Sequence, residues 1–197
     1  MSNPVDDQTI VRSCLQGDER AFAELVSRYN AAIYRLAWRM LRNEEEARDV
    51  VQEVFLRVYR ALASYDQNRK FSTWILRIAT NLCIDRLRRK KVKLLSINID
   101  DSDEDRVPVI LAEEGPGPDA LYGKTSLREK LDEMIMQMTP IYRIVVELRY
   151  KQGLSYDEIS AVLEIPLGTV KARLHRAHRY LKDELEAGGI GPDLLDR

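Results

Sequence analysis

A run of basic side chains near the C-terminal end of the chain has the chemistry needed to bind nucleic acid. Five lysines or arginines and two histidines stand between positions 171 and 182 with no acid among them: Lys171, Arg173, His175, Arg176, His178, Arg179 and Lys182. Lysine and arginine bind phosphate oxygens, and arginine also bonds the edge of guanine in the major groove. The alternative is a merely solvated helix surface, but such surfaces usually mix both signs of charge. The run therefore favours a DNA-binding face.

The flanking residues predict two helices, joined by a tight turn, that would position this face. Ser155 and Glu158 have the spacing of a capping box, which starts a helix. Pro166 disfavours helix in the residue before it and suits the first turn of a second helix. The second helix has an apolar stripe at spacings of three and four, formed by Val170, Leu174, Ala177, Leu181 and Leu185. Its opposite face carries Ala172, His175, Arg176, Arg179 and Lys182. This pattern predicts a helix-turn-helix, whose second helix lies in a major groove.

A second candidate site combines aromatic rings with cations around a predicted turn at 64–70. The side chains are Tyr65, Arg69, Lys70, Phe71, Trp74 and Arg77. Such a mixture binds unstacked bases and their backbone, although we expect Phe71 itself to belong to the core. The helix that follows, 71–91, is apolar over most of its circumference and is predicted to be mostly buried. Its one polar stripe consists of Thr73, Arg77, Asn81 and Arg88.

A third candidate site lies on the predicted helix 44–63. Its apolar stripe is Ala47, Val50, Val51, Val54, Val58 and Leu62. The far face collects Asp49, Gln52, Glu53, Leu56 and Arg60. A leucine within a polar, partly acidic face can mark a protein contact or can be one scattered surface residue. The pattern alone leaves both interpretations open.

Local signals divide the rest of the N-terminal half into helices. A short helix at 6–15 should end before Gly17, and Asp18 should cap a longer helix with a sustained apolar stripe from Phe22 to Met40. Asn43 is predicted to cap the helix 44–63, whose first turn is acidic. Ser72 or Thr73 is expected to cap the helix that follows the turn 64–70.

The predicted fold is all-α, with two small helical domains joined by a flexible acidic linker. Residues 1–93 form the first domain, and residues 94–126, which contain DDSDED and EEGPGPD, form the linker. Residues 127–186 form the second, in which Thr139 and Pro140 begin a helix that ends at Gly153. The tail, 187–197, is expected to be poorly ordered.

Composition narrows the classes of function that remain. The net charge is −1, but residues 1–93 hold 18 basic and 12 acidic side chains, whereas residues 94–126 hold 2 and 8. A globally neutral chain can therefore present local basic surfaces. No apolar run is long enough to span a membrane and no signal peptide opens the chain, so we expect a cytoplasmic protein. Cys14 and Cys83 lack metal-ligand spacing, and we expect no metal and no cofactor.

Three stretches together resemble the bacterial RNA polymerase sigma factors of the extracytoplasmic-function type, group 4 of the sigma-70 superfamily. They are DVVQEVFLRVYRAL (49–62), FSTWILRIATNLCIDRLRRKK (71–91) and LSYDEIS followed by IPLGTVKARLHRAHRYL. The resemblance extends from Gly17 to Leu185 and looks greatest to the sigma-W-like members. It implies a non-enzymatic subunit that binds core RNA polymerase and directs promoter-specific initiation, with a role in stress responses.

The resemblance also implies roles for particular residues. Asp49, Gln52, Glu53 and Leu56 match the surface that docks on core polymerase. Residues that match recognition and melting of the −10 element are Tyr65, Arg69, Lys70, Trp74, Arg77, Asn81 and Arg88. Residues that match binding of the −35 duplex are Arg149, Thr169, Lys171, Ala172, Arg173, His175, Arg176 and Arg179. The linker would thread the RNA exit path of the polymerase.

The chain departs from the family in one position, and two rival functions stay open. Ala172 stands where relatives often carry a hydroxyl, so its contact can only be apolar, for instance to a thymine methyl. The resemblance also implies a membrane-bound anti-sigma partner, with no membrane insertion of this chain. One rival is a stand-alone helix-turn-helix regulator, which would bind a palindromic site without polymerase. The other, a metal enzyme using His175, His178 and the cysteines, has no acidic ligand within reach in the sequence.

Overall fold

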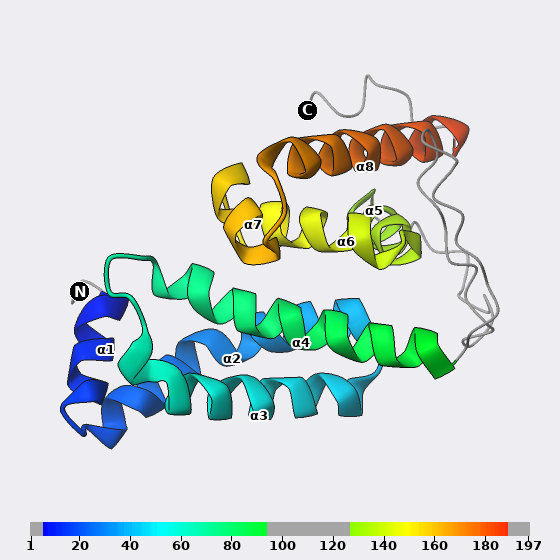
Figure 1. Cartoon of the computed structure of the whole chain (residues 1–197). Helices are drawn as coiled ribbons and strands as arrows, with labels where there is room; N and C mark the ends of the chain where they lie inside the picture. The colour runs from blue at the N-terminus through cyan, green and yellow to red at the C-terminus, as the bar shows by residue number, and fades with distance from the viewer. Residues whose placement is uncertain (1–5, 94–126, 189–197) are drawn as a thin grey trace. The chain divides into compact units, whose positions relative to one another are not determined.

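The computed structural model describes residues 6–93 and 127–188, and the elements within these ranges are helices (Figure 1). The predicted all-α fold class is confirmed. The predicted linker, 94–126, and residues 189–197 of the predicted tail lie outside the described residues. Packing contacts divide the chain into two units.

The first unit contains α1 (Asp7–Leu15), α2 (Glu19–Leu41), α3 (Glu44–Ala61) and α4 (Phe71–Lys93). Their predicted boundaries are largely confirmed because local signals set them. Gly17 takes the left-handed conformation that ends α1, with φ of 90°. The side chain of Asp18 accepts a hydrogen bond from the Arg20 amide at 2.9 Å, and that of Asn43 accepts one from the Glu46 amide at 2.9 Å.

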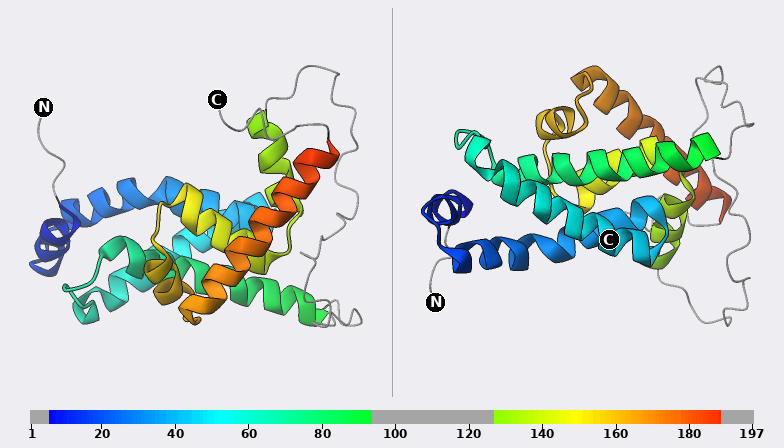
Figure 2. Two further views of the ribbon diagram at one scale, coloured as in Figure 1. Left: turned by 90° about the horizontal axis from the view of Figure 1, so that it is seen from above. Right: turned by 60° about the horizontal axis from the view of Figure 1, so that its bottom comes forward.

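The helices of the first unit enclose one apolar core. Helices α2, α3 and α4 pack against one another along their lengths, and α1 packs on α2 (Figures 1 and 2). All six residues of the predicted apolar stripe are buried, five of them on α3 and the sixth, Leu62, in the 3-10 turn directly after it. Helix α4 contributes Phe71, Ile75, Ala79 and Cys83 to the same core. The core therefore fixes which faces of α3 and α4 remain available to a partner.

The start of α4 agrees with the predicted range 71–91, but the predicted cap does not. The helix begins at Phe71, so Ser72 and Thr73 lie in its first turn and the prediction that one of them is the cap was wrong. The amide of Trp74 already donates to the Lys70 carbonyl at 3.2 Å. Phe71 is only 1% exposed. Because Phe71 is buried among aromatic rings, packing holds it in the helical conformation as the first residue of α4.

The second unit contains α5 (Leu127–Gln137), α6 (Pro140–Val146), a π-helical turn η2 (Glu147–Lys151) and α8 (Leu167–Ala187). Helix α6 packs on α8, and α5 contacts both. Arg143 is buried, and its Nη2 donates to the carbonyls of Met136 and Met138, both at 2.6 Å. A guanidinium therefore binds one carbonyl group in the last turn of α5 and one just after it, where a helix has no partners of its own to offer.

The predicted helix-turn-helix residues form α7 (Tyr156–Leu163) and α8. The chain turns at Glu164, with φ of 54°, and Pro166 precedes α8 as predicted. Val170, Leu174, Ala177 and Leu185 are buried, which confirms most of the predicted stripe, and Leu181 is half-buried. By packing contacts, residues 157–165 group with the first unit, in contrast to the predicted domain 127–186. The domain bounds therefore stay a prediction.

Within the described ranges, no helix is both long enough and apolar enough to cross a membrane.

Candidate nucleic-acid and protein interfaces

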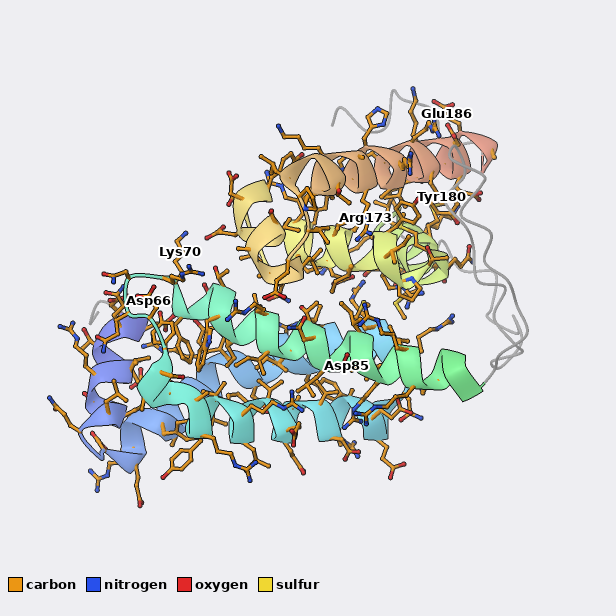
Figure 3. The ribbon with its side chains drawn as sticks, in the orientation of Figure 1. Asp66, Lys70, Asp85, Arg173, Tyr180 and Glu186 are labelled. Atoms are coloured by element: carbon orange, nitrogen blue, oxygen red, sulfur yellow. The ribbon has the colours of Figure 1, made fainter. Side chains whose placement is uncertain are left out.

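Helix α8 carries most of the residues that the sequence assigned to duplex binding. Lys171, Ala172, His175 and Arg179 are exposed on it, while Thr169, Arg173 and Arg176 are half-buried (Arg173 is labelled in Figure 3). Exposed cations on a helix backed by the buried residues of its own stripe can reach phosphates and base edges together. The structure thus brings these seven residues onto one element.

Arg149, the eighth residue of this predicted set, lies on η2. Its Nη1 donates to the carbonyl of Leu154 at 2.9 Å, and its guanidinium lies over the ring of Tyr156, 5.1 Å from the ring centroid. These contacts tie η2 to the start of α7. A contact of Arg149 with the −35 duplex would use the remaining N–H groups of the guanidinium.

A contact between η2 and α8 was not predicted from the sequence. The Tyr150 hydroxyl hydrogen-bonds Nε2 of His178 at 2.6 Å, and the two rings lie 5.5 Å apart. Partial desolvation beside Tyr150 and the neighbouring His175 lower the pKa of His178, although its ring is still partly exposed. No local pattern could have shown this pairing, because 28 residues separate the partners.

The candidate protein-contact face on α3 is exposed as predicted. Asp49 and Gln52 are exposed, and Leu56 is 51% exposed, a high value for a leucine. Glu53 bonds Nε of Arg57 at 2.7 Å, and this bond lowers the pKa of the Glu53 carboxyl. The face therefore combines an ionised carboxylate, that of Glu53, with an exposed apolar side chain, that of Leu56.

Tyr59 extends this face, although it was not predicted from the sequence. It is 69% exposed and lies seven residues after Gln52, on the same side of the helix. Its ring packs edge-on against Phe22, with 5.2 Å between centroids. The period of the exposed face could have indicated it, since position 59 follows Leu56 by three residues.

Tyr65 does not lie where a base contact would need it. It is only 6% exposed, and its hydroxyl donates to the Arg69 carbonyl. The structure assigns Tyr65 to the packing beneath the turn that precedes α4. Asp66 and Lys70 lie on this turn (Figure 3), and the Asp66 carboxylate accepts from the Asn68 amide at 3.0 Å.

Four aromatic rings form a cluster, called the aromatic cluster below: Tyr29, Tyr65, Phe71 and Trp74. Phe71 lies at its centre, with ring centroids 5.4 Å from Tyr29, 5.5 Å from Tyr65 and 5.6 Å from Trp74. The expectation that Phe71 belongs to the core is confirmed. Trp74 is half-buried, so part of its indole ring can still stack on a base.

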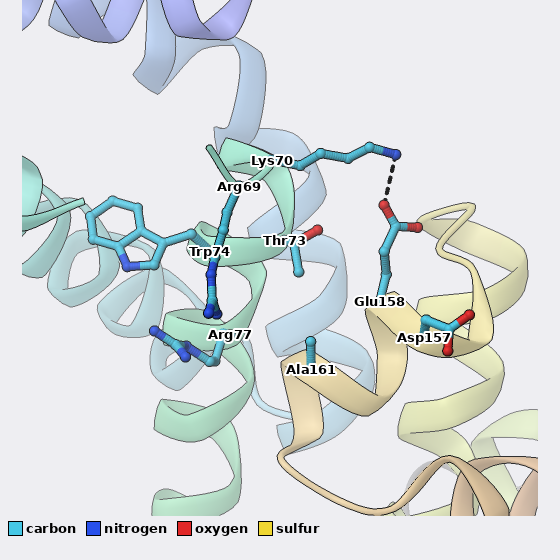
Figure 4. Close-up of a pocket in the computed structure, with 8 residues that line it drawn as sticks. All are labelled: Arg69, Lys70, Thr73, Trp74, Arg77, Asp157, Glu158 and Ala161. Atoms are coloured by element: carbon cyan, nitrogen blue, oxygen red, sulfur yellow. Dashed lines mark ion pairs between the residues drawn. The ribbon is translucent and has the colours of Figure 1, made fainter. Parts of the chain in front are cut away.

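The cations of the predicted −10 set lie beside Trp74. Figure 4 shows Arg69, Lys70, Thr73, Trp74 and Arg77 lining one side of a pocket of about 400 Å³. Residues of α7, which packing contacts group with the first unit, line the same pocket, and Glu158 pairs with Lys70 at 2.8 Å. Farther along α4, Asn81 and Arg88 are exposed. The polar stripe predicted on α4 is thus exposed at its C-terminal end, at Asn81 and Arg88. Cations gather at its N-terminal end, beside Trp74.

The described residues contain no group of three or more His, Cys, Asp or Glu placed to hold a metal ion. Cys14 and Cys83 are free thiols. Burial raises the pKa of Cys83 to about 12, so this thiol stays protonated and unreactive near neutral pH.

The chain matches two family descriptions: Sigma-70 region 2 over residues 25–92 and Sigma-70, region 4 over residues 128–181. It is 39% identical over 176 residues to the ECF RNA polymerase sigma factor SigW of Bacillus subtilis, which covers 89% of this chain and 94% of that protein. It is 32% identical over 187 residues to the ECF RNA polymerase sigma-E factor of Escherichia coli, covering 94% and 97%.

Two solved structures share the fold. One is CnrH in complex with the cytosolic domain of CnrY, with a TM-score of 0.64, 24% identity and coverage of 92% of this chain and 97% of that one. The other is the sigma factor RpoE in complex with the anti-sigma factor NepR from Bartonella quintana, with a TM-score of 0.63, 21% identity and coverage of 84% and 96%.

We predict that His178 titrates below the ordinary histidine pKa of about 6.5. Its folded-state pKa is lowered, so its neutral form contributes stability that is present above the unfolded pKa and is lost as the pH falls through the folded one. NMR titration measures this directly, because the chain has only two histidines. The His178→Gln variant identifies the resonance. A His178 pKa at or above 6.5 would contradict the packing described for this ring.

Proposed function

Because the chain belongs to the sigma-70 family of RNA polymerase sigma factors, in its extracytoplasmic-function group, we propose that it binds core RNA polymerase and directs promoter-specific transcription initiation. The observation that carries this function is the order of the two family regions, region 2 over 25–92 and region 4 over 128–181. A relative with 39% identity over most of both chains supports it. The protein then acts by binding and catalyses no reaction of its own, in the cytoplasm where core polymerase works.

The exposed face of α3 is the proposed contact with core polymerase. It comprises Asp49, Gln52, Glu53 and Leu56, and Tyr59 extends it. An apolar side chain ringed by polar ones is the arrangement that protein interfaces use at their centres. Leu56 is therefore the proposed anchor of this contact.

The turn before α4 and the polar stripe of α4 are the proposed −10 reader. Arg69, Lys70, Arg77 and Arg88 would bind the backbone of the open strand, and Asn81 would contact an extruded base. Unstacking a base costs a few kcal/mol, which stacking on Trp74 and pocket contacts can offset. Promoter opening would thus be driven by binding energy. Because Tyr65 is buried, we propose a supporting role for it instead of a base contact.

Helix α8 is the proposed −35 reader, as the recognition helix of the helix-turn-helix. The proposed contacts to base edges are made by Ala172, His175 and Arg176. Backbone contacts are proposed for Arg149, Thr169, Lys171, Arg173 and Arg179. The side chain of Ala172 is a single methyl group, so it can make only an apolar contact, such as one to a thymine methyl. Arginine can pair with guanine through two hydrogen bonds, so Arg176 is the residue proposed to set specificity.

The proposed domain bounds are 1–93 and 127–186, and the two family matches on either side of segment 94–126 support them. This connecting segment is proposed to lie in the RNA exit path of the polymerase. An anti-sigma factor is the proposed regulator. The similar folds solved in complex with anti-sigma factors or with CnrY support it. A stand-alone regulator is not favoured, because region 2 matches a polymerase-binding family.

We expect the substitution Leu56→Arg to abolish binding to purified core polymerase, since it places a charge at the centre of the proposed interface. Leu15→Arg is the matched control, because Leu15 is also an exposed leucine of the first unit, at 42%. Titration of fluorescently labelled protein with core enzyme measures both affinities. Equal affinities of the wild-type chain and the Leu56→Arg variant would exclude this interface.

We expect Arg176→Ala to cost about 1–3 kcal/mol at one base pair of the −35 element and to relax the preference there. Lys171→Ala, at a proposed phosphate contact, should instead weaken binding evenly across sequences and lower its salt dependence. Competition binding to duplexes that differ in single base pairs measures both effects. Uniform weakening by Arg176→Ala would make this residue a phosphate contact.

A further inference from the structure

Helix α1 reaches the turn at residues 64–70 that precedes α4. We propose that α1 positions this turn for −10 recognition, through a direct hydrogen bond from Gln8 and through the Asp7–Tyr29 contact that backs the aromatic cluster. The proposal rests on the proposed function of the turn. Helix α1 lies outside the region 2 match, which begins at residue 25, and none of its residues belongs to the proposed polymerase or DNA contacts.

The direct contact joins α1 to the middle of the turn. Nε2 of Gln8 donates to the carbonyl of Gln67 at 3.0 Å across 59 residues of sequence. Figures 1 and 2 show α1 at the end of the bundle where α3 leads through the turn into α4. A hydrogen bond to a backbone carbonyl fixes the path of the chain regardless of the side chain at that position.

The second contact acts through the aromatic cluster. The Asp7 carboxylate accepts a hydrogen bond from the Tyr29 hydroxyl and pairs with Arg28 at 3.0 Å. The Tyr29 ring packs edge-on against Phe71 at 5.4 Å, and Phe71 packs against Tyr65 at 5.5 Å. Tyr65 and Phe71 are the residues at either side of the exposed part of the turn. Asp7 thus holds the ring that packs on Phe71, and Phe71 in turn packs on Tyr65.

Helix α1 is itself fixed firmly enough to act as a support. Ile10 and Val11 are buried, and the helix packs on α2. Residues 66–70, in contrast, are all exposed. Their contacts within the turn are polar and local, such as Arg69 with Asp66 at 3.4 Å. An exposed polar turn that must grip a flipped base binds more tightly when it is held in shape before binding.

The test replaces Gln8 by Glu, which removes the donor and sets a carboxylate against the Gln67 carbonyl. Gln16→Glu is the matched control, because it makes the same change of charge at an exposed position of the same N-terminal segment. The second pair is Tyr29→Phe, which removes only the hydroxyl that reaches Asp7, with Tyr34→Phe as its control. All four variants are assembled with core polymerase on the promoter that the wild-type protein transcribes best from a genomic library.

The main measurement is promoter opening, followed by permanganate reactivity of thymines at the −10 element. We expect Gln8→Glu and Tyr29→Phe each to lower opening about three- to ten-fold, the range that one hydrogen bond accounts for. The controls should match the wild type. Affinities for core polymerase and for −35 duplex should be unchanged in all four. The fluorescence of Trp38 and Trp74, both in the first unit, checks that this unit stays folded.

Three results would overturn the inference. The first is that each test variant opens the promoter as well as its control does, Gln8→Glu as well as Gln16→Glu and Tyr29→Phe as well as Tyr34→Phe. This result would show that α1 does not act on the turn. Equal losses of opening and of core affinity would show general damage to the first unit instead of a positioning role. If the wild-type protein itself gives no promoter-dependent transcript, the proposed function fails and the inference fails with it.

Discussion

The burial of Phe71 is the contact on which the arrangement of the first unit depends. Its ring meets Tyr29 of α2, Tyr65 of the turn and Trp74 of α4, and it is 1% exposed. Aromatic pairs of this kind contribute about 0.5–1.5 kcal/mol each beyond the area they bury. Because Phe71 is the first residue of α4, this contact fixes both where the helix starts and which of its faces stays exposed. The exposed stripe on α4 follows from it.

The distribution of charge explains how a nearly neutral protein can bind DNA. Acidic residues occur where they serve local purposes, such as the first turn of α3 and the pair of Glu53 with Arg57. The basic run 171–182 and the cations beside Trp74 stay concentrated on particular faces. A local basic surface is enough for phosphate contacts, and a low net charge keeps nonspecific binding weak. Specificity then depends on two sites used together with polymerase.

Most helices and the apolar stripes on α3 and α8 could be predicted because local rules set them. The caps Asp18 and Asn43, the stop at Gly17 and the period of the stripe on α3 involve residues a few positions apart. Tyr59 could have been found from the same local period, since it follows Leu56 by three residues. Other features depend on residues distant in sequence. The aromatic cluster that buries Tyr65 includes Tyr29 of α2, and the bond from Gln8 to Gln67 spans 59 residues. A helical period describes one element and cannot show which distant side chain will pack against it.

The central claim is that this chain directs initiation by binding core polymerase and reading two promoter elements. Runoff transcription with purified core polymerase and a genomic promoter library tests it most directly. We expect transcripts only when the protein is present, from promoters that share a −35 and a −10 element at a nearly constant spacing. The absence of such transcripts, together with tight binding to a palindromic duplex without polymerase, would contradict it and indicate a stand-alone regulator.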